Sequence, residues 1–231
     1  MKSLQLTWDE EVVSWFPSLA VSAGIIRGVK VERTNAEAEK LRIIVFSEAR
    51  SAFKLDELKN NNIVRAYRDL FWALDIDPTK TRPSGEALLR RVLHGKDIPQ
   101  ISSAVDAYNL ASLQTIVPIS GFDLDTVTPP LHVRFSEKGD VFQSIGVETA
   151  EQLDEKMLLV TDRSLVLCVY PHKDADATKI TGKTQNILLI GYGAPSISED
   201  TLVEAVSLAL TYVHQVAGGR VEGVEVYSAK P

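Results

Sequence analysis

The pattern of hydrophobic and polar positions divides the chain into an early pair of strands, a helical stretch and a late run of strands. "LQLTW" (4–8) alternates, and "LAVSAGIIRGVKV" (19–31) is the small and β-branched run typical of a buried strand. Trp15, Phe16 and Pro17 between them indicate an exposed turn or a short helix. Residues 35–75 carry helical periodicity, and "KNNN" (59–62) divides this stretch into two helices.

Two further helices are predicted before residue 115. In "RPSGEALLRRVLHGKD" (82–97), Ser84 is the expected N-cap and Gly95 the expected end. A second helix over 103–113 follows Pro99, and the spacing of Ser103 and Asp106 resembles a capping box. Asp106 therefore has a structural explanation, as a cap of its own helix.

Strand patterns dominate the rest of the chain. "LHVRF" (131–135) and "VFQSI" (141–145) flank the turn "SEKGD" and predict a hairpin, and three apolar runs at 157–162, 165–170 and 186–193 continue the sheet. A closing helix is predicted where Ser196 and Glu199 have capping-box spacing, and Gly218–Gly219 should end it. This order predicts an α+β fold in a single domain over 1–231, and the lack of regular β-α alternation argues against a Rossmann fold.

One predicted helix has a face of mixed character. Asp106, Asn109, Leu110 and Leu113 lie three and four positions apart, so they share a face on which two leucines favour burial and two polar side chains need partners. The following strand changes its apolar parity at Gly121, which predicts a β-bulge there. Such a bulge would bring two polar side chains of the strand near Asn109, and the mixed face would then form one wall of a pocket. These side chains are Ser120 and Asp123.

Net charge and cysteine content indicate which binding partners and which cellular compartment to expect for the protein. The net charge is 25 − 31 = −6, which argues against non-specific DNA binding. No apolar run reaches the roughly 20 residues that span a bilayer, so no membrane partner is expected. The N-terminus lacks the apolar core of a signal peptide, and Cys168 is the only cysteine, which together favour a cytoplasmic protein.

One stretch of the sequence is basic, although the chain as a whole has a negative net charge. Residues 80–96 have a net charge of 5 − 1 = +4. They form either a solvated helix face with a Glu86–Arg90 pair or a surface that contacts phosphates. The candidate RNA-binding residues are Arg82, Arg90, Arg91 and Lys96.

Common cofactor and metal motifs are incomplete. "TGKT" (181–184) resembles the end of a phosphate-binding loop, but Ala177 stands where that loop needs a glycine. The four histidines lack zinc-site spacing, there is no GxSxG elbow, and Cys168 lies within an apolar run. We therefore expect no cofactor and no metal.

The series "VDAYNL…VPISGFDLD…LHVRFSEKGDVF…TDRSLVLCVY…KITGKTQNILL" resembles the B3/B4 domain of the bacterial phenylalanyl-tRNA synthetase beta subunit over roughly residues 100–192. The stretch "RPSGEALLRRVLHGKDIPQI" is similar to free-standing relatives of that domain. The resemblance implies an α+β module that hydrolyses tyrosine wrongly attached to phenylalanine tRNA. The synthetase's aminoacylation core has no counterpart in this chain.

The resemblance also implies site residues. The family's pocket asparagine matches Asn109, while its threonine position holds Tyr108 and its histidine position holds Ser120. The family's glutamate falls near Ala177, with Asp174 and Asp176 close by. Asn109 and Ser120 are thus the candidate catalytic residues. Candidate substrate-binding residues are Asp106, Tyr108, Phe122 and Asp123.

These observations leave three hypotheses for function. The first is hydrolysis in trans of mischarged aminoacyl-tRNA esters, with tRNA or aminoacyl-tRNA as the partner. The second is a non-catalytic module that binds tRNA, an amino acid or a similar small molecule. The third is an interaction protein without a ligand. Ester hydrolysis needs only a positioned water and stabilisation of the developing oxyanion, so the departures from the family pattern do not by themselves exclude an enzyme.

Overall fold

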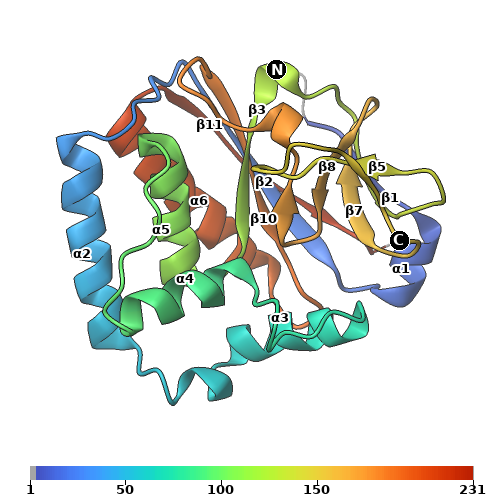
Figure 1. Cartoon of the computed structure of the whole chain (residues 1–231), viewed down its shortest axis with the longest axis horizontal. Helices are drawn as coiled ribbons and strands as arrows, with labels where there is room; N and C mark the ends of the chain where they lie inside the picture. Colours follow the sequence, from blue (N-terminus) through green and yellow to red (C-terminus); the bar gives the residue numbers. More distant parts are fainter. Residues whose placement is uncertain (1–3, 231) are drawn as a thin grey trace.

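The computed structural model describes residues 4–230, and its fold is α+β with most helices in the first half of the chain (Figure 1). The helices are α1 (Glu10–Trp15), α2 (Ala36–Ala52), α3 (Asn62–Ala73), α4 (Ser84–Leu93), α5 (Ser103–Thr115) and α6 (Glu199–Ala217). The longer strands are β1 (Leu6–Trp8), β2 (Ala20–Arg27), β3 (Ile119–Asp123), β4 (Leu131–Phe135), β7 (Leu158–Thr161), β8 (Val166–Val169), β10 (Asn186–Tyr192) and β11 (Arg220–Ser228). Three two-residue strands complete the set: β5 (Val141–Phe142), β6 (Glu151–Gln152) and β9 (Lys173–Asp174).

The strands form two larger sheets rather than one. The first has the order β11-β2-β10-β3 and is antiparallel throughout. The second has the order β1-β4-β7-β8-β9, in which only the β1–β4 pair is parallel. β3 therefore lies at an edge of its sheet, and that edge borders the site described below.

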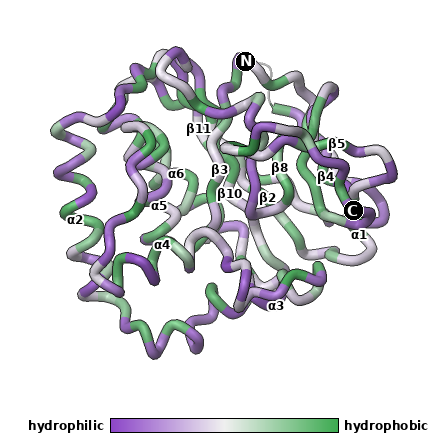
Figure 2. Tube along the Cα trace, viewed as in Figure 1, coloured by the Kyte–Doolittle hydropathy of each residue, from purple (hydrophilic) through white to green (hydrophobic). Residues whose placement is uncertain are grey.

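The four-stranded sheet is buried on both faces. In β10, Ile187 and Leu189 pack with the helices, whereas Leu188 and Ile190 pack with the five-stranded sheet. Since both faces are covered, β10 has a continuous apolar sequence instead of an alternating one. Figure 2 shows hydrophobic segments along the inner strands and hydrophilic ones in the outer loops.

Helix α5 is the central helix of the helical layer. Ten of its thirteen residues are buried, and it packs against α2, α4, α6 and β3. It begins one residue earlier than the capping-box spacing predicts, because Ser102 is the N-cap and its side chain accepts a hydrogen bond from the Val105 N–H. The predicted role of Asp106 at this end is confirmed, since its carboxylate accepts a 2.8 Å hydrogen bond from the Ile101 N–H.

The predicted hairpin of 131–135 and 141–145 is wrong. β4 is already paired on both edges, with β1 on one side and β7 on the other, so β5 pairs with β6 instead. The intervening turn is held by an ion pair between Arg134 and Asp140, with a closest N–O distance of 2.7 Å. Spacing alone did not reveal that the two edges of β4 are occupied by segments far away in the sequence.

The starts of two helices and the last element of the chain also differ from expectation. Pro83 is the N-cap of α4, so Ser84 is its first helical residue and makes no cap hydrogen bond. α6 is capped by Ser198 rather than Ser196, because Ser198 has the extended backbone of a cap and accepts from the Thr201 N–H. α6 is followed by β11, which pairs with β2, so the helix does not close the chain. Within residues 4–230, no helix is both long and apolar enough to cross a membrane.

Candidate functional site

A cavity of about 260 Å³ lies between α5 and the edge of β3 that faces away from β10. Val105, Ile119 and Ile180 give it apolar walls, and Ser84 at the start of α4 reaches its rim. The prediction that the helices at 83–94 and 103–113 border one cavity is confirmed. The polar side chains that line it are Tyr108, Asn109, Ser120, His172, Asp174 and Lys179.

Ser120 and Asp174 form the innermost polar pair of this cavity. The Ser120 hydroxyl donates a 2.7 Å hydrogen bond to an Asp174 carboxylate oxygen. Burial raises the pKa of Asp174 to about 6, and the hydrogen bond from Ser120 opposes this rise only in part. Asp174 has no ion-pair partner among the described residues. The cavity therefore contains a carboxylate with a pKa of about 6 that forms no ion pair with Lys179 of the same cavity wall, because Lys179 pairs with Asp176 instead.

Asn109 presents its side chain to the cavity from α5. It is only partly buried, and its amide makes no hydrogen bond with any other residue in the described part of the chain. We expected it to bond to backbone near Ser120 or to an ordered water, and it makes no bond to that backbone, because the side chain faces the open cavity instead. An amide carries two donors and one acceptor, so Asn109 can bind a polar group of a ligand.

The β-bulge predicted at Gly121 is also wrong. β3 pairs with β10 in an unbroken register, with Ser120 opposite Ile190 and Gly121 opposite Leu189. The apolar parity changes because β3 is buried on both faces, not because a residue is inserted. Gly121 instead allows close packing, since a Cβ there would lie 2.6 Å from Cε1 of the Tyr108 ring.

His172 lies beside Asp174 and was not selected from the sequence. Burial, followed by the charge of Lys173, lowers the pKa of His172 to about 4, so its ring is neutral at pH 7. Its Nδ1 is buried without a hydrogen-bond partner among the described residues. The ring thus adds a neutral polar group to the cavity wall.

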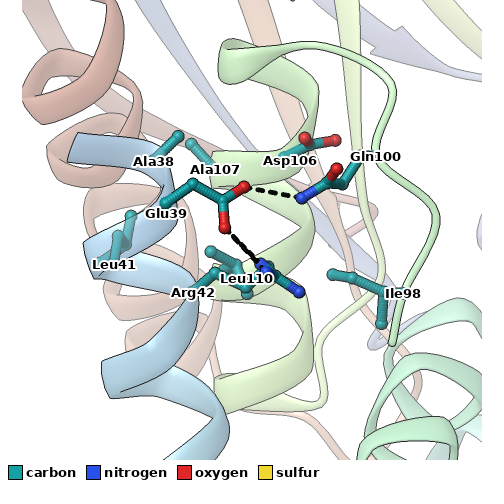
Figure 3. Close-up of a pocket in the computed structure, with 9 residues that line it drawn as sticks. All are labelled: Ala38, Glu39, Leu41, Arg42, Ile98, Gln100, Asp106, Ala107 and Leu110. Atoms are coloured by element: carbon teal, nitrogen blue, oxygen red, sulfur yellow. Dashed lines mark hydrogen bonds and ion pairs between the residues drawn. The ribbon is translucent and has the colours of Figure 1, made fainter. Parts of the chain in front are cut away.

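Three of the predicted substrate-binding residues lie outside this cavity. Asp106 faces α2 on the other side of α5, where burial raises its pKa and it borders a smaller pocket near Glu39 and Arg42 (Figure 3). Phe122 is fully buried between the two sheets. Asp123 accepts a 2.6 Å hydrogen bond from the Thr184 hydroxyl beyond the cavity. The mixed face of α5 is therefore split between two sides of the helix.

The predicted basic surface is partly occupied by ion pairs. Glu86 is buried in α4, and its carboxylate binds both Arg90 and Arg68 of α3. Burial alone would raise the pKa of Glu86, but hydrogen bonds from the two arginines outweigh it and lower that pKa. The Arg91 guanidinium donates to the Asp97 carbonyl oxygen.

Of the four predicted RNA-binding residues, only Arg90 is in a side-chain ion pair with another described residue, and Arg91 is bonded to a backbone carbonyl. Arg82 and Lys96 are exposed and make no side-chain ion pair within residues 4–230. Arg82 lies two residues before Ser84, which lines the cavity. In the same described range, no group of three His, Cys, Asp or Glu side chains is arranged to hold a metal ion.

Comparison with known proteins agrees with this architecture. The beta subunit of phenylalanine–tRNA ligase from Neisseria meningitidis serogroup B is 28% identical over 123 residues, which cover 53% of this chain and 16% of that subunit. Its serogroup A counterpart is 29% identical over 110 residues, or 47% of this chain and 14% of that subunit. The chain thus matches only a small part of these relatives.

A solved structure shows the same fold at low sequence identity. An N-terminal fragment of the phenylalanyl-tRNA synthetase beta subunit from Pyrococcus horikoshii superposes with a TM-score of 0.50 and 14% identity. The match covers 95% of this chain and 50% of that one. The model of one domain family, the B3/4 domain, matches residues 66–209, which is more than half of the chain and contains every polar residue of the cavity wall. The chain therefore belongs to the B3/4 domain family.

Proposed function

We propose that this protein hydrolyses the ester bond of aminoacyl-tRNA, with the aminoacyl group held in the cavity between α5 and β3. The observation that carries the proposal is the Asp174 carboxylate, which faces the cavity beside Ser120 and has a pKa of about 6. A group with this pKa is largely ionised at pH 7, yet it is more basic than an ordinary carboxylate. The relatives that match this chain are tRNA ligase subunits, which supports tRNA as the carrier of the ester.

Each residue has a defined part in the proposed reaction. Asp174 takes a proton from a water molecule as that water attacks the ester carbonyl carbon. Negative charge then develops on the carbonyl oxygen, toward which the Asn109 amide donates a hydrogen bond. The tetrahedral intermediate expels the ribose oxygen of the tRNA, and Asp174 returns the proton to it. The products are a free amino acid and an uncharged tRNA.

The tRNA itself is proposed to contact the basic residues around α4. Arg82 precedes the residue at the cavity rim, and Lys96 lies beyond the other end of the helix. Phosphate contacts of this kind supply affinity without sequence preference.

A second candidate function is binding without catalysis. Ser120 stands where the family resemblance expects a histidine, and its hydroxyl is already used to donate to Asp174. If Asp174 serves only to bind the ammonium group of an aminoacyl moiety, the cavity would bind its ligand and leave the ester intact.

A deacylation assay separates these two functions. Wild-type protein is incubated with a panel of tRNAs charged with different amino acids, and loss of the ester is followed over time. Asn109→Asp should fold and lose activity tenfold or more, about 1.4 kcal/mol, because its charge opposes the developing oxyanion. Asn62→Asp is the matched control, since Asn62 is exposed on α3 and lies outside the cavity.

The results expected from the two functions differ clearly. Hydrolysis of at least one charged tRNA, reduced in the Asn109 variant but not in the Asn62 variant, supports the enzyme. Binding of charged tRNA without ester loss supports the binding module. Full activity of Asn109→Asp would contradict the assigned role of Asn109.

A further inference from the structure

Two large apolar side chains in the cavity wall are exposed to water. Ile101 is 58% exposed and Ile145 is 51% exposed, and both line the cavity between α5 and β3. The deeper aliphatic side chains of the same wall are buried, namely Val105, Ile119 and Ile180. The exposed surfaces of Ile101 and Ile145 therefore lie at the mouth of the cavity, where a ligand can cover them and remove apolar area from water.

Backbone hydrogen bonds hold both isoleucines in place. The Ile145 N–H donates a 3.0 Å hydrogen bond to the Asp174 carbonyl oxygen, which fixes the segment after β5 against β9. The Ile101 N–H donates a 2.8 Å hydrogen bond to the Asp106 carboxylate, immediately before α5 begins. Neither side chain is the tip of a free loop, so a ligand that covers them orders little additional backbone.

The position of the ester in the proposed reaction determines what lies at this mouth. The carbonyl carbon is placed between Asn109 and Asp174, which are both partly buried in the cavity wall. The terminal ribose of the tRNA is joined to that carbon through the ester oxygen. The cavity of about 260 Å³ is smaller than the roughly 300–1,000 Å³ of pockets that enclose a drug-sized ligand. The aminoacyl group therefore occupies the cavity, and the terminal nucleoside stays at the mouth.

A nucleobase suits the exposed surface of the two isoleucines. Every tRNA ends in an unpaired adenosine, and proteins hold unpaired bases by stacking their flat faces on aromatic or apolar side chains. Isoleucine is branched at Cβ and stiff at χ1, so each of these side chains presents a fixed apolar surface. A base that contacts both would also exclude water from the mouth of the cavity.

We propose that Ile101 and Ile145 hold the terminal base of the tRNA at the mouth of the cavity and thereby direct the aminoacyl ester to Asn109 and Asp174. This inference rests on the proposed function, which places the ester in the cavity. It assigns to the protein a substrate of the aminoacyl-nucleoside class, in preference to simple amino-acid esters.

Two non-hydrolysable analogues measure the contribution of the base. In one, an amide joins the amino acid to the 3′ position of adenosine, and in the other, to the same ribose without a base. In isothermal titration, wild-type protein should bind the adenosine analogue about tenfold more tightly, as expected for one stacked base. The double variant Ile101→Ser, Ile145→Ser should lose most of this preference and bind the base-free analogue as the wild type does.

Ile44→Ser is the matched control. Ile44 lies on α2, is 51% exposed like Ile145, and does not line the cavity. This variant should keep the wild-type preference for the adenosine analogue. Thermal unfolding checks that each variant is folded, and if the double variant is not, the two single variants are compared with the same control.

Kinetics with charged tRNA provide an independent measurement. The double variant should raise KM more than it lowers kcat, because contacts with the base are the same in the bound substrate and in the transition state. Equal affinity of the wild type for the two analogues, or an adenosine preference that persists in the double variant, would overturn the inference. A lower oligomeric state of the double variant with an unchanged preference would overturn it as well, and would assign the two side chains to a contact between copies of the chain.

Failure of the inference and failure of the proposed function give different results. Base-dependent binding that requires the two isoleucines, without deacylation of any charged tRNA, would keep the inference and reject the proposed enzyme. Deacylation with the same KM in the wild type and the double variant would keep the enzyme and reject the inference.

Discussion

Replacing Asp174 by asparagine should stabilise the fold at neutral pH. The substitution keeps the size of the side chain and an acceptor for the Ser120 hydroxyl, but removes the charge that burial disfavours. A buried carboxylate without an ion-pair partner lowers the stability of the fold. Such a group is expected at a functional site, where a residue needed for activity can be unfavourable for stability.

The magnitude follows from the pKa of Asp174. In the unfolded chain the pKa is near 3.8, and in the folded protein it is about 6. The folded state therefore binds more protons between pH 4 and 6, and stability falls as pH rises through that window. A difference of about 2 in pKa corresponds to about 3 kcal/mol above pH 6. Since Asp174 is only partly buried, we expect Asp174→Asn to gain about 2 kcal/mol at pH 7.5.

Urea unfolding at pH 7.5 and pH 4 measures this effect. Asp174→Asn should be more stable than wild type at pH 7.5 and nearly equal to it at pH 4. Asp162→Asn is a control of opposite sign. Burial raises the pKa of Asp162, but hydrogen bonds from the N–H groups of Thr128, Ser164 and Leu165 outweigh burial and lower that pKa. Its charge stabilises the fold above pH 4, so this variant should lose stability at pH 7.5.

The reasoning fails if Asp174→Asn is no more stable than wild type at pH 7.5, or if its advantage persists unchanged at pH 4. Either result would mean that the cavity carboxylate titrates like an exposed one. Its use as a base near neutral pH would then have no support.

Three further predictions concern packing and charge. Gly121→Ala should cost about 1–3 kcal/mol in urea unfolding and weaken ligand binding, because its Cβ would meet the Tyr108 ring; in a double-mutant cycle the same substitution should cost less in a Tyr108→Ala background, and an equal cost would refute this steric cause. Glu86→Ala should lower the free energy of unfolding by about 3 kcal/mol, because it leaves two arginines without their shared carboxylate. A Tm equal to that of the wild type in thermal unfolding would disprove that role. In filter binding of tRNA, Arg82→Ala with Lys96→Ala should flatten the salt dependence by about one slope unit per lost phosphate contact, and identical slopes would exclude these residues from the interface.

Much of the architecture could be predicted from local sequence patterns. Gly95 and Gly218 end α4 and α6, and the apolar runs at 186–193 and 19–31 contain the buried strands β10 and β2. Strand pairing was less predictable, because nothing near Leu131–Phe135 in the sequence shows that β1 and β7 occupy both of its edges. β11 was missed because none of its residues is buried and they lack the apolar run of a buried strand.

The cavity was predicted in part and for a partly wrong reason. Asn109 and Ser120 do line it, but the mixed face of α5 is divided, with Asp106 facing α2. Helical periodicity gives the angle of a side chain around its helix and not the element that it meets. Asp174 and His172 reach the cavity only through the pairing of β8 with β9, which a short polar segment does not reveal.

Binding of a non-hydrolysable substrate analogue tests the central claim most directly. Analogues in which an amide joins an amino acid to the 3′ position of adenosine reproduce the end of aminoacyl-tRNA without a cleavable ester. Isothermal titration should detect binding of at least one such analogue to wild-type protein, and Asn109→Asp should bind it at least tenfold more weakly while Asn62→Asp binds it normally. Equal affinity in all three proteins, or no binding across the analogue series, would contradict an aminoacyl site between α5 and β3.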